Sequence, residues 1–181
     1  EDVNRENVIE EYNWVSAAEF LDSLGVDVIS TSLGYIFFDD SQMDHGYDDL
    51  DGKTAVITIG AEIAASKGIL CVNAAGNDGA NDFPYISAPA DGKNVLTVGA
   101  VGIDGNRAYF SSVGPTSDGR IKPDVMANGY GTTVASVWDS YYDGSGTSYA
   151  CPVLAGMVTC LWQANKHHPA SAIRDVLRQN A

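Results

Sequence analysis

Residues 144–152 read Gly-Ser-Gly-Thr-Ser-Tyr-Ala-Cys-Pro, and a long apolar helical pattern follows them. Pro152 has no backbone N–H, so a helix tolerates it readily only in the first turn. The helix is therefore expected to begin near Thr147 or Ser148. A hydroxyl there lies among unpaired backbone N–H groups at the positive end of the helix dipole, which would stabilise a developing oxyanion. From these residues alone, Ser148 is either a nucleophile or an ordinary N-cap.

Helical and strand-like segments alternate along the chain. Helices are expected over residues 14–24, 54–67, 148–166 and 171–179, and strands over residues 26–30, 69–75 and 94–101. In the second helix, the residues expected to face the core are Val56, Ile59, Ile63 and Ala64. Such alternation is typical of a parallel sheet covered by helices. The sequence therefore predicts an α/β fold, and a length of 181 residues without a linker predicts one domain.

The excess of acidic over basic residues argues against two classes of binding partner. The chain has 24 acidic residues against 10 Lys and Arg, which gives a formal net charge of −14. Nucleic acids and anionic membrane surfaces attract clustered cations, so neither is expected as a partner. No apolar run approaches the roughly 18 residues that would span a bilayer, and no membrane span is expected.

Three cysteines, Cys71, Cys151 and Cys160, do not form a disulfide framework. Cys151 and Cys160 are nine positions apart on one expected helix, which places them on opposite faces. They cannot pair with each other, and the simplest interpretation is three buried thiols.

Asn77 follows an expected strand in the run Val-Asn-Ala-Ala-Gly-Asn-Asp-Gly over residues 72–79. Ligand sites in open α/β sheets collect at the carboxyl ends of the strands, where an amide donor could serve a ligand. The alternative is an ordinary turn residue, because Asn is common in turns.

Four segments together carry a family resemblance. They are Ser32-Leu33-Gly34, Ala75-Gly76-Asn77, Lys122-Pro123-Asp124-Val125 followed by Gly129, and Gly146-Thr147-Ser148-Tyr149-Ala150-Cys151-Pro152. In this order they resemble the subtilisin-like serine peptidases (the subtilase family), roughly from Trp14 to Leu177. The resemblance implies a three-layer α/β/α fold with a mainly parallel sheet. It corresponds to the carboxyl-terminal part of the catalytic domain, so residues 1–181 are expected to be a partial domain, incomplete at the N-terminus.

The resemblance also assigns roles. Ser148 matches the nucleophile that forms the acyl-enzyme, and Asn77 matches the side-chain donor of the oxyanion hole, with the Ser148 backbone N–H as its partner. The strand that pairs with an extended polypeptide substrate is matched by Ser32, Leu33 and Gly34. One wall of the primary specificity pocket is matched by Ala74, Ala75 and Gly76.

The Asp and His of the family's triad should precede Ser32, but the 31 residues before it contain no His. The three histidines are His45, His167 and His168. His167 lies 19 positions after Ser148, which is roughly 28 Å along a continuous helix. We therefore expect a serine endopeptidase whose upstream Asp and His segment is absent here, so that this chain alone is inactive. The alternative is a non-catalytic peptide-binding or interaction module on the same fold.

Residues 39–52 form an acidic loop that contains His45 and six aspartates. Its carboxylates could bind calcium, although a solvated acidic loop is the simpler interpretation and catalysis should need no cofactor or metal. His45 is expected to be a solvated loop residue. A polypeptide is the expected substrate, and self-association is expected through surface that an absent N-terminal part would cover. The resemblance implies secretion or a cell-envelope location.

Overall fold

A four-stranded parallel sheet forms the centre of the computed structural model, which describes residues 5–181. The strands are β1 (Val28–Thr31), β2 (Leu70–Ala74), β3 (Leu96–Val101) and β4 (Val125–Asn128), and they lie in the order β1-β2-β3-β4. In register, Val28 lies opposite Leu70 and Val98 lies opposite Val125. Every pair is parallel, as the alternating sequence pattern predicted.

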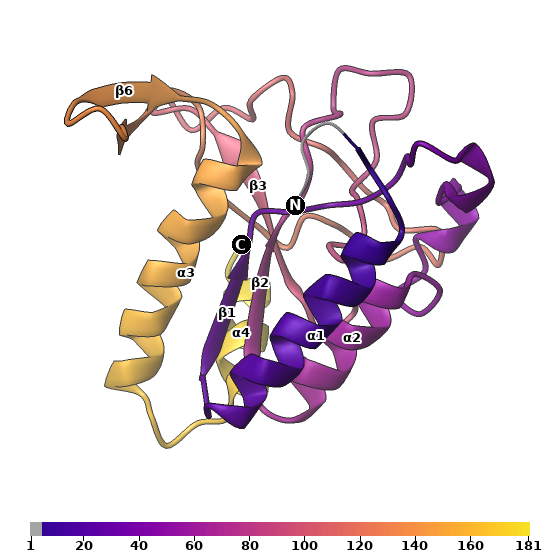
Figure 1. Cartoon of the computed structure of the whole chain (residues 1–181). Coiled ribbons are helices and arrows are strands. Elements are labelled where there is room, and N and C mark those ends of the chain that lie inside the picture. The colour runs from indigo at the N-terminus through magenta and orange to yellow at the C-terminus, as the bar shows by residue number, and fades with distance from the viewer. Residues whose placement is uncertain (1–4) are drawn as a thin grey trace.

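Helices cover both faces of this sheet (Figure 1). The pair α1 (Ile9–Ser23) and α2 (Val56–Ser66) lies on one face, and the pair α3 (Thr147–Ala164) and α4 (Ala170–Gln179) lies on the other. Two short 3₁₀ helices, η1 (Ser41–Met43) and η2 (Tyr47–Asp49), lie in the acidic loop. The predicted three-layer α/β/α arrangement is confirmed. Within residues 5–181, no helix combines the length and apolar character needed to cross a membrane.

Strand β2 shows why the sheet is buried on both faces. Leu70 and Val72 pack in one apolar cluster with Leu154 and Val158 of α3. Cys71 packs on the opposite face in a second cluster, which contains Ala61 and Ala64 of α2. Because side chains alternate along a strand, a strand buried on both faces must be apolar throughout, and this accounts for the run that marks β2 in the sequence.

Helix α2 turns a different face to the core from the one expected. Ile59 and Ile63 are 42% and 53% exposed, although both were expected to point inward. The buried residues are Ile57, Thr58, Gly60 and Ala61, together with Ala64, which was expected to face inward. Helix α2 also packs closely against α1. A Cβ on Gly60 would lie only 2.6 Å from Cγ2 of Val15. The apolar periodicity of α2 alone did not reveal this second packing partner.

Helix α1 begins at Ile9, five positions before the expected start. Its first turn contains Glu10 and Glu11, which are buried, although charged residues are rarely buried without partners. Glu11 pairs with His45 of the acidic loop and accepts a hydrogen bond from the Ile57 N–H at 2.9 Å. These contacts join residues far apart in sequence, so local propensity could not show them.

A two-stranded antiparallel hairpin leads into α3. It consists of β5 (Thr132–Ala135) and β6 (Tyr141–Gly144), with Thr132 opposite Gly144. Figure 1 shows the hairpin projecting from the sheet at the amino end of α3. Val137 and Trp138 at its tip are 92% and 85% exposed.

The cysteine prediction is partly wrong. Cys71 and Cys151 are buried, but Cys160 is exposed, and all three are free thiols. Cys151 and Cys160 lie on opposite faces of α3 as expected, and this is why only one of them reaches the core.

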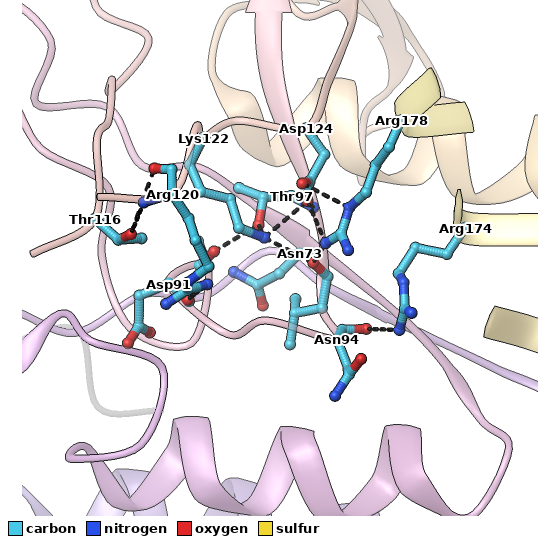
Figure 2. A network of polar contacts seen from close by, with 12 residues as sticks. Asn73, Asp91, Asn94, Thr97, Thr116, Arg120, Lys122, Asp124, Arg174 and Arg178 are labelled. Carbon is cyan, nitrogen blue, oxygen red and sulfur yellow. Dashed lines mark hydrogen bonds and ion pairs between the residues drawn. The ribbon is translucent and has the colours of Figure 1, made fainter. Parts of the chain in front are cut away.

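A buried ionic network ties α4 to the sheet (Figure 2). Lys122 Nζ donates to Val95 O, Thr97 Oγ1 and Asp124 Oδ2, each at 2.8 Å. Arg178 of α4 forms an ion pair with Asp124 at 2.7 Å. Burial lowers the pKa of Lys122 to about 8, although the attraction of Asp124 opposes the shift.

Candidate active site

A cleft of about 370 Å³ opens where the carboxyl ends of β1 and β2 meet the amino end of α3. Its lining residues are Glu6, Ser32, Leu33, Gly34, Ile36, Phe37, Ala74, Gly76, Asn77, Asp78, Ser87, Thr147 and Ser148. The cleft therefore brings together every predicted site residue except Ala75. Ala75 is fully buried and packs with Ile86 and Ala90 beneath the surface, so it does not line the cleft, and its place in the pocket wall stays a prediction.

Ser148 is the second residue of α3, and it is half-buried. The N-cap position is held by Gly146, whose N–H donates to Gly129 O at 2.8 Å. Gly129 permits this contact, because a Cβ there would lie 2.7 Å from Gly146 O and 2.9 Å from the Ala150 Cβ. The structure thus excludes Ser148 as the N-cap and leaves its hydroxyl at the cleft.

The side chain of Asn77 hydrogen-bonds to the first residue of α3 and not to the backbone of its own turn. Its Oδ1 accepts from the Thr147 N–H at 2.9 Å and lies 3.1 Å from Thr147 Oγ1. Because the amide oxygen is engaged, the Nδ2 donor is directed away from these contacts. Neither Asn77 Nδ2 nor the Ser148 N–H has a hydrogen-bond acceptor among residues 5–181. Both donors therefore belong to residues that line the same cleft.

Thr147 links the start of α3 to the segment that follows β2, a role that the sequence did not predict. The residue is fully buried. Its Oγ1 accepts from the Gly76 N–H at 3.2 Å and lies at the same distance from Gly76 O. Gly76 has a φ of +111°, a region that side-chain-bearing residues avoid. The motif Gly-Thr-Ser thus contributes a clamp as well as a hydroxyl at the helix start.

Ser87 closes one side of the cleft, and sequence reasoning missed it. The side chain is buried, and a Cβ on Gly34 would lie 2.0 Å from its Oγ. Gly34 and Ser87 therefore occupy adjoining space in which only one side chain fits. Nothing in the local sequence around Ser87 indicates this contact, because it depends on how distant segments meet.

None of the three histidines lines the cleft. His45 pairs with the buried carboxylate of Glu11, and its ring lies edge-on to Phe38 with centroids 5.5 Å apart. The hydrogen bond to Glu11 raises the pKa of His45, although burial opposes it. His45 is therefore a half-buried structural residue, and the expectation of a solvated loop residue is wrong. The His168 carbonyl accepts from Trp162 Nε1 at 2.9 Å, beyond the far end of α3.

Carboxylates of the acidic loop bind nearby backbone N–H groups. Asp44 accepts from the Phe38 N–H at 2.7 Å, and Asp51 accepts from the Lys53 N–H at 2.9 Å. Within residues 5–181, no three His, Cys, Asp or Glu side chains gather into a group that could hold a metal ion. Calcium binding by this loop therefore stays a prediction for which no formed site is seen.

Comparisons with known proteins point to one family. The model of the subtilase family (Peptidase_S8) matches residues 1–181. The chain is 35% identical over 142 residues to the membrane-bound transcription factor site-1 protease of Rattus norvegicus, covering 75% of this chain and 12% of that protein. It is 31% identical over 173 residues to subtilisin NAT of Bacillus subtilis subsp. natto, covering 94% of this chain and 40% of that protein.

Among solved structures, the self-cleaved protease domain of PatA superimposes with a TM-score of 0.75 at 23% identity. The match covers 94% of this chain and 60% of that domain. Because the identity is only 23%, the match bears on the fold alone. The chain spans less than half of the length of the two relatives named above. Because the family model matches the whole sequence and the fold agrees, this chain belongs to the subtilase family of serine peptidases.

Proposed function

We propose that this chain carries the nucleophile and the oxyanion hole of a subtilisin-like serine endopeptidase. One observation supports the proposal above the others: Ser148 lies at the cleft together with two unpaired donors, the Ser148 N–H and Asn77 Nδ2. A binding module would need neither a nucleophilic hydroxyl nor free donors beside it.

The proposed reaction is hydrolysis of a peptide bond through an acyl-enzyme. Ser148 Oγ attacks the carbonyl carbon and loses its proton to a base, while the electron pair of the C=O bond moves to oxygen. The two donors stabilise that oxyanion. The amine then leaves with a proton, and water releases the acyl group from Ser148. No metal or cofactor is needed for these steps.

We propose an extended polypeptide as the substrate. Ser32, Leu33 and Gly34 follow β1 directly and line the cleft, so their main-chain groups could pair with a peptide as an added strand. Ala74 and Gly76 have little or no side chain, and together with Ser87 they leave room for one substrate side chain.

The chain of 181 residues alone is proposed to be inactive. No histidine lines the cleft, and a serine hydroxyl without a base is a weak nucleophile at neutral pH. Loss of triad function costs on the order of 10⁴–10⁶ in turnover, a range measured in subtilisin, which belongs to the same family. An Asp and a His from another segment of the full-length protein would complete the site.

Two further properties are proposed, one for the whole protein and one for the 181-residue chain. Export to the envelope or the medium is proposed from the family resemblance. Self-association of the 181-residue chain is supported by β1, which lies at an edge of the sheet, and by Val153 and Met157 on α3, which are 48% and 46% exposed. Light scattering at high concentration tests this, and a strictly monomeric species would contradict it.

Fluorophosphonate labelling tests the proposed activity. The full-length protein should be labelled stoichiometrically on Ser148, the 181-residue chain should not, and Ser148→Ala should remove labelling altogether. Mass mapping of the modified peptide identifies the residue. Absence of labelling in the full-length protein would favour the second candidate, a non-catalytic peptide-binding module, which the lack of a histidine at the cleft supports. Labelling of the short chain would reveal a base within it.

A further inference from the structure

Helix α3 contains a proline where its backbone ladder should continue. Pro152 is the sixth residue of a helix that begins at Thr147, and it is one turn beyond Ser148. A residue at this position would normally donate its N–H to the carbonyl four residues earlier, which is the Ser148 carbonyl. Proline has no N–H, so the carbonyl of the proposed nucleophile lacks its helical partner.

Ser32 supplies the missing hydrogen bond. Its Oγ donates to Ser148 O at 2.9 Å, across 116 positions of sequence. In the opposite direction, Ser148 Oγ lies 3.4 Å from Ser32 O. The two serines therefore contact each other reciprocally, because the hydroxyl of each donates to the carbonyl oxygen of the other. Ser32 fits the gap that Pro152 creates.

A second contact one turn along α3 supports the same junction. Cys151 Sγ donates to Thr31 O at 3.3 Å, so the last residue of β1 and the residue after it each contact the first part of α3. Burial raises the pKa of the Cys151 thiol, which keeps the S–H donor in place. The amino end of α3 is thus registered against the carboxyl end of β1 at the nucleophile.

We propose that the Ser32 hydroxyl is a positioning residue for Ser148, an inference that rests on the proposed peptidase function. It holds the Ser148 backbone through the carbonyl that Pro152 leaves unpaired. Without it, the Ser148 hydroxyl and N–H would move relative to Asn77 and to a bound peptide. Acyl transfer is sensitive to such displacements, because a misplacement of about 1 Å can cost a factor of 10².

The position of Ser32 separates this role from substrate binding. Pairing with a peptide would use the main-chain N–H and C=O of residues 32–34, which Ser32→Ala retains. The variant should therefore lower kcat about 10- to 100-fold and change KM less than about threefold. Ser32→Thr restores a hydroxyl and should recover most of the activity. A purely structural residue would show neither this split nor this rescue.

Pro152 provides a sharper test. Ser32→Ala combined with Pro152→Ala returns an N–H to the Ser148 carbonyl through the helix itself. The double variant of the full-length protein should be more active than Ser32→Ala alone. The effects of the two substitutions on kcat are then non-additive in a double-mutant cycle. Ser23→Ala is the matched control, since that hydroxyl donates to Phe20 O at 2.6 Å at the end of α1 and does not contact Ser148 or Cys151. Its kcat should equal that of the wild type.

Hydrogen exchange of the full-length protein makes the inference testable apart from activity. Ser32→Ala should speed exchange of the amides in the first two turns of α3, and Ser23→Ala should not. Unchanged exchange together with an unchanged kcat would overturn the inference. A rise in KM at constant kcat, or an additive cycle with Pro152→Ala, would overturn it as well. If the wild-type protein is neither labelled nor active, the peptidase proposal fails and exchange alone decides whether Ser32 positions α3.

Discussion

The cleft at Ser148 and the network around Lys122 both place polar groups on the same sheet, but they use those groups differently. In the network, Lys122 Nζ donates to three acceptors, and Asp124 is held by both Lys122 and Arg178 (Figure 2). At the cleft, Asn77 Nδ2 and the Ser148 N–H have no acceptor among residues 5–181. Paired groups buried from solvent hold segments together, whereas unpaired donors at a cleft are available to a ligand. Substitutions should therefore affect stability in one region and rate in the other.

The largest expected effect is on stability. Lys122→Met removes the cation and leaves Val95 O and Thr97 Oγ1 without this donor, while Asp124 keeps its ion pair with Arg178. Breaking a buried pair typically costs about 3–5 kcal/mol of unfolding free energy, and because Arg178 still compensates Asp124 the loss should lie at the lower end of this range. Urea unfolding followed by circular dichroism measures the change. Lys93 is an exposed lysine, and Lys93→Met is the control. Its unfolding free energy should stay within about 0.5 kcal/mol of the wild type. A Lys122 variant as stable as Lys93→Met would contradict the structural role of the network.

Asn77→Ala should lower the catalytic rate more than the stability. In the full-length protein it removes an oxyanion donor, and kcat should fall by about 10² to 10³, the range known for this donor in subtilisin from the same family. Unfolding free energy should fall by about 1–3 kcal/mol, because the buried Thr147 N–H loses Asn77 Oδ1 as its acceptor. Asn106→Ala in the loop after β3 is the matched control for loss of an exposed amide. Equal kcat values for the two variants would remove Asn77 from the proposed mechanism.

Thr147→Val tests whether the cleft also contains a structural clamp. The substitution keeps the shape but removes the hydroxyl that contacts Gly76 and Asn77. A buried donor left unpaired costs about 1–3 kcal/mol, so unfolding free energy should fall by that amount. The kcat should fall as well, because Asn77 loses one of its anchors. Full activity at reduced stability would limit Thr147 to the structural role.

The sequence predicted those parts of the cleft that are carried by short contiguous motifs. Ser148 and Asn77 each follow a local signal, a helix start and a strand end, and the structure brings both signals to one cleft. The parallel sheet was predictable for a similar reason, because burial on both faces leaves apolar runs such as β2.

The remaining features depend on contacts between distant segments. Ser87 reaches the cleft from a loop without a motif, and Ala75 is buried because that same loop packs over it. The early start of α1 depends on Glu11, whose partners lie 34 and 46 positions away. Arg178 reaches Asp124 only after α4 has packed on the sheet. Periodicity and propensity describe neighbours in sequence, so these features were not predictable.

The smallest expected effect is on the pH dependence of stability. It concerns the ion pair of His45 and Glu11. The hydrogen bond to Glu11 raises the pKa of His45 in the folded protein above its unfolded value near 6.5. The folded state then binds the proton more tightly, so this contribution to stability is complete below about pH 6.5. It is lost as the pH rises through the raised folded pKa.

Unfolding free energies measured in urea from pH 6 to pH 9 should therefore decline in the wild type more steeply than in His45→Gln. Glu11→Gln should remove the same slope, because it removes the group that raises the pKa. His167→Gln is the control, and it should keep the wild-type slope because that ring has no contact with Glu11. Parallel curves for the wild type and His45→Gln would show that the pair does not stabilise the protonated form. The pair would then belong with surface ion pairs, which contribute little, and not with the buried network around Lys122.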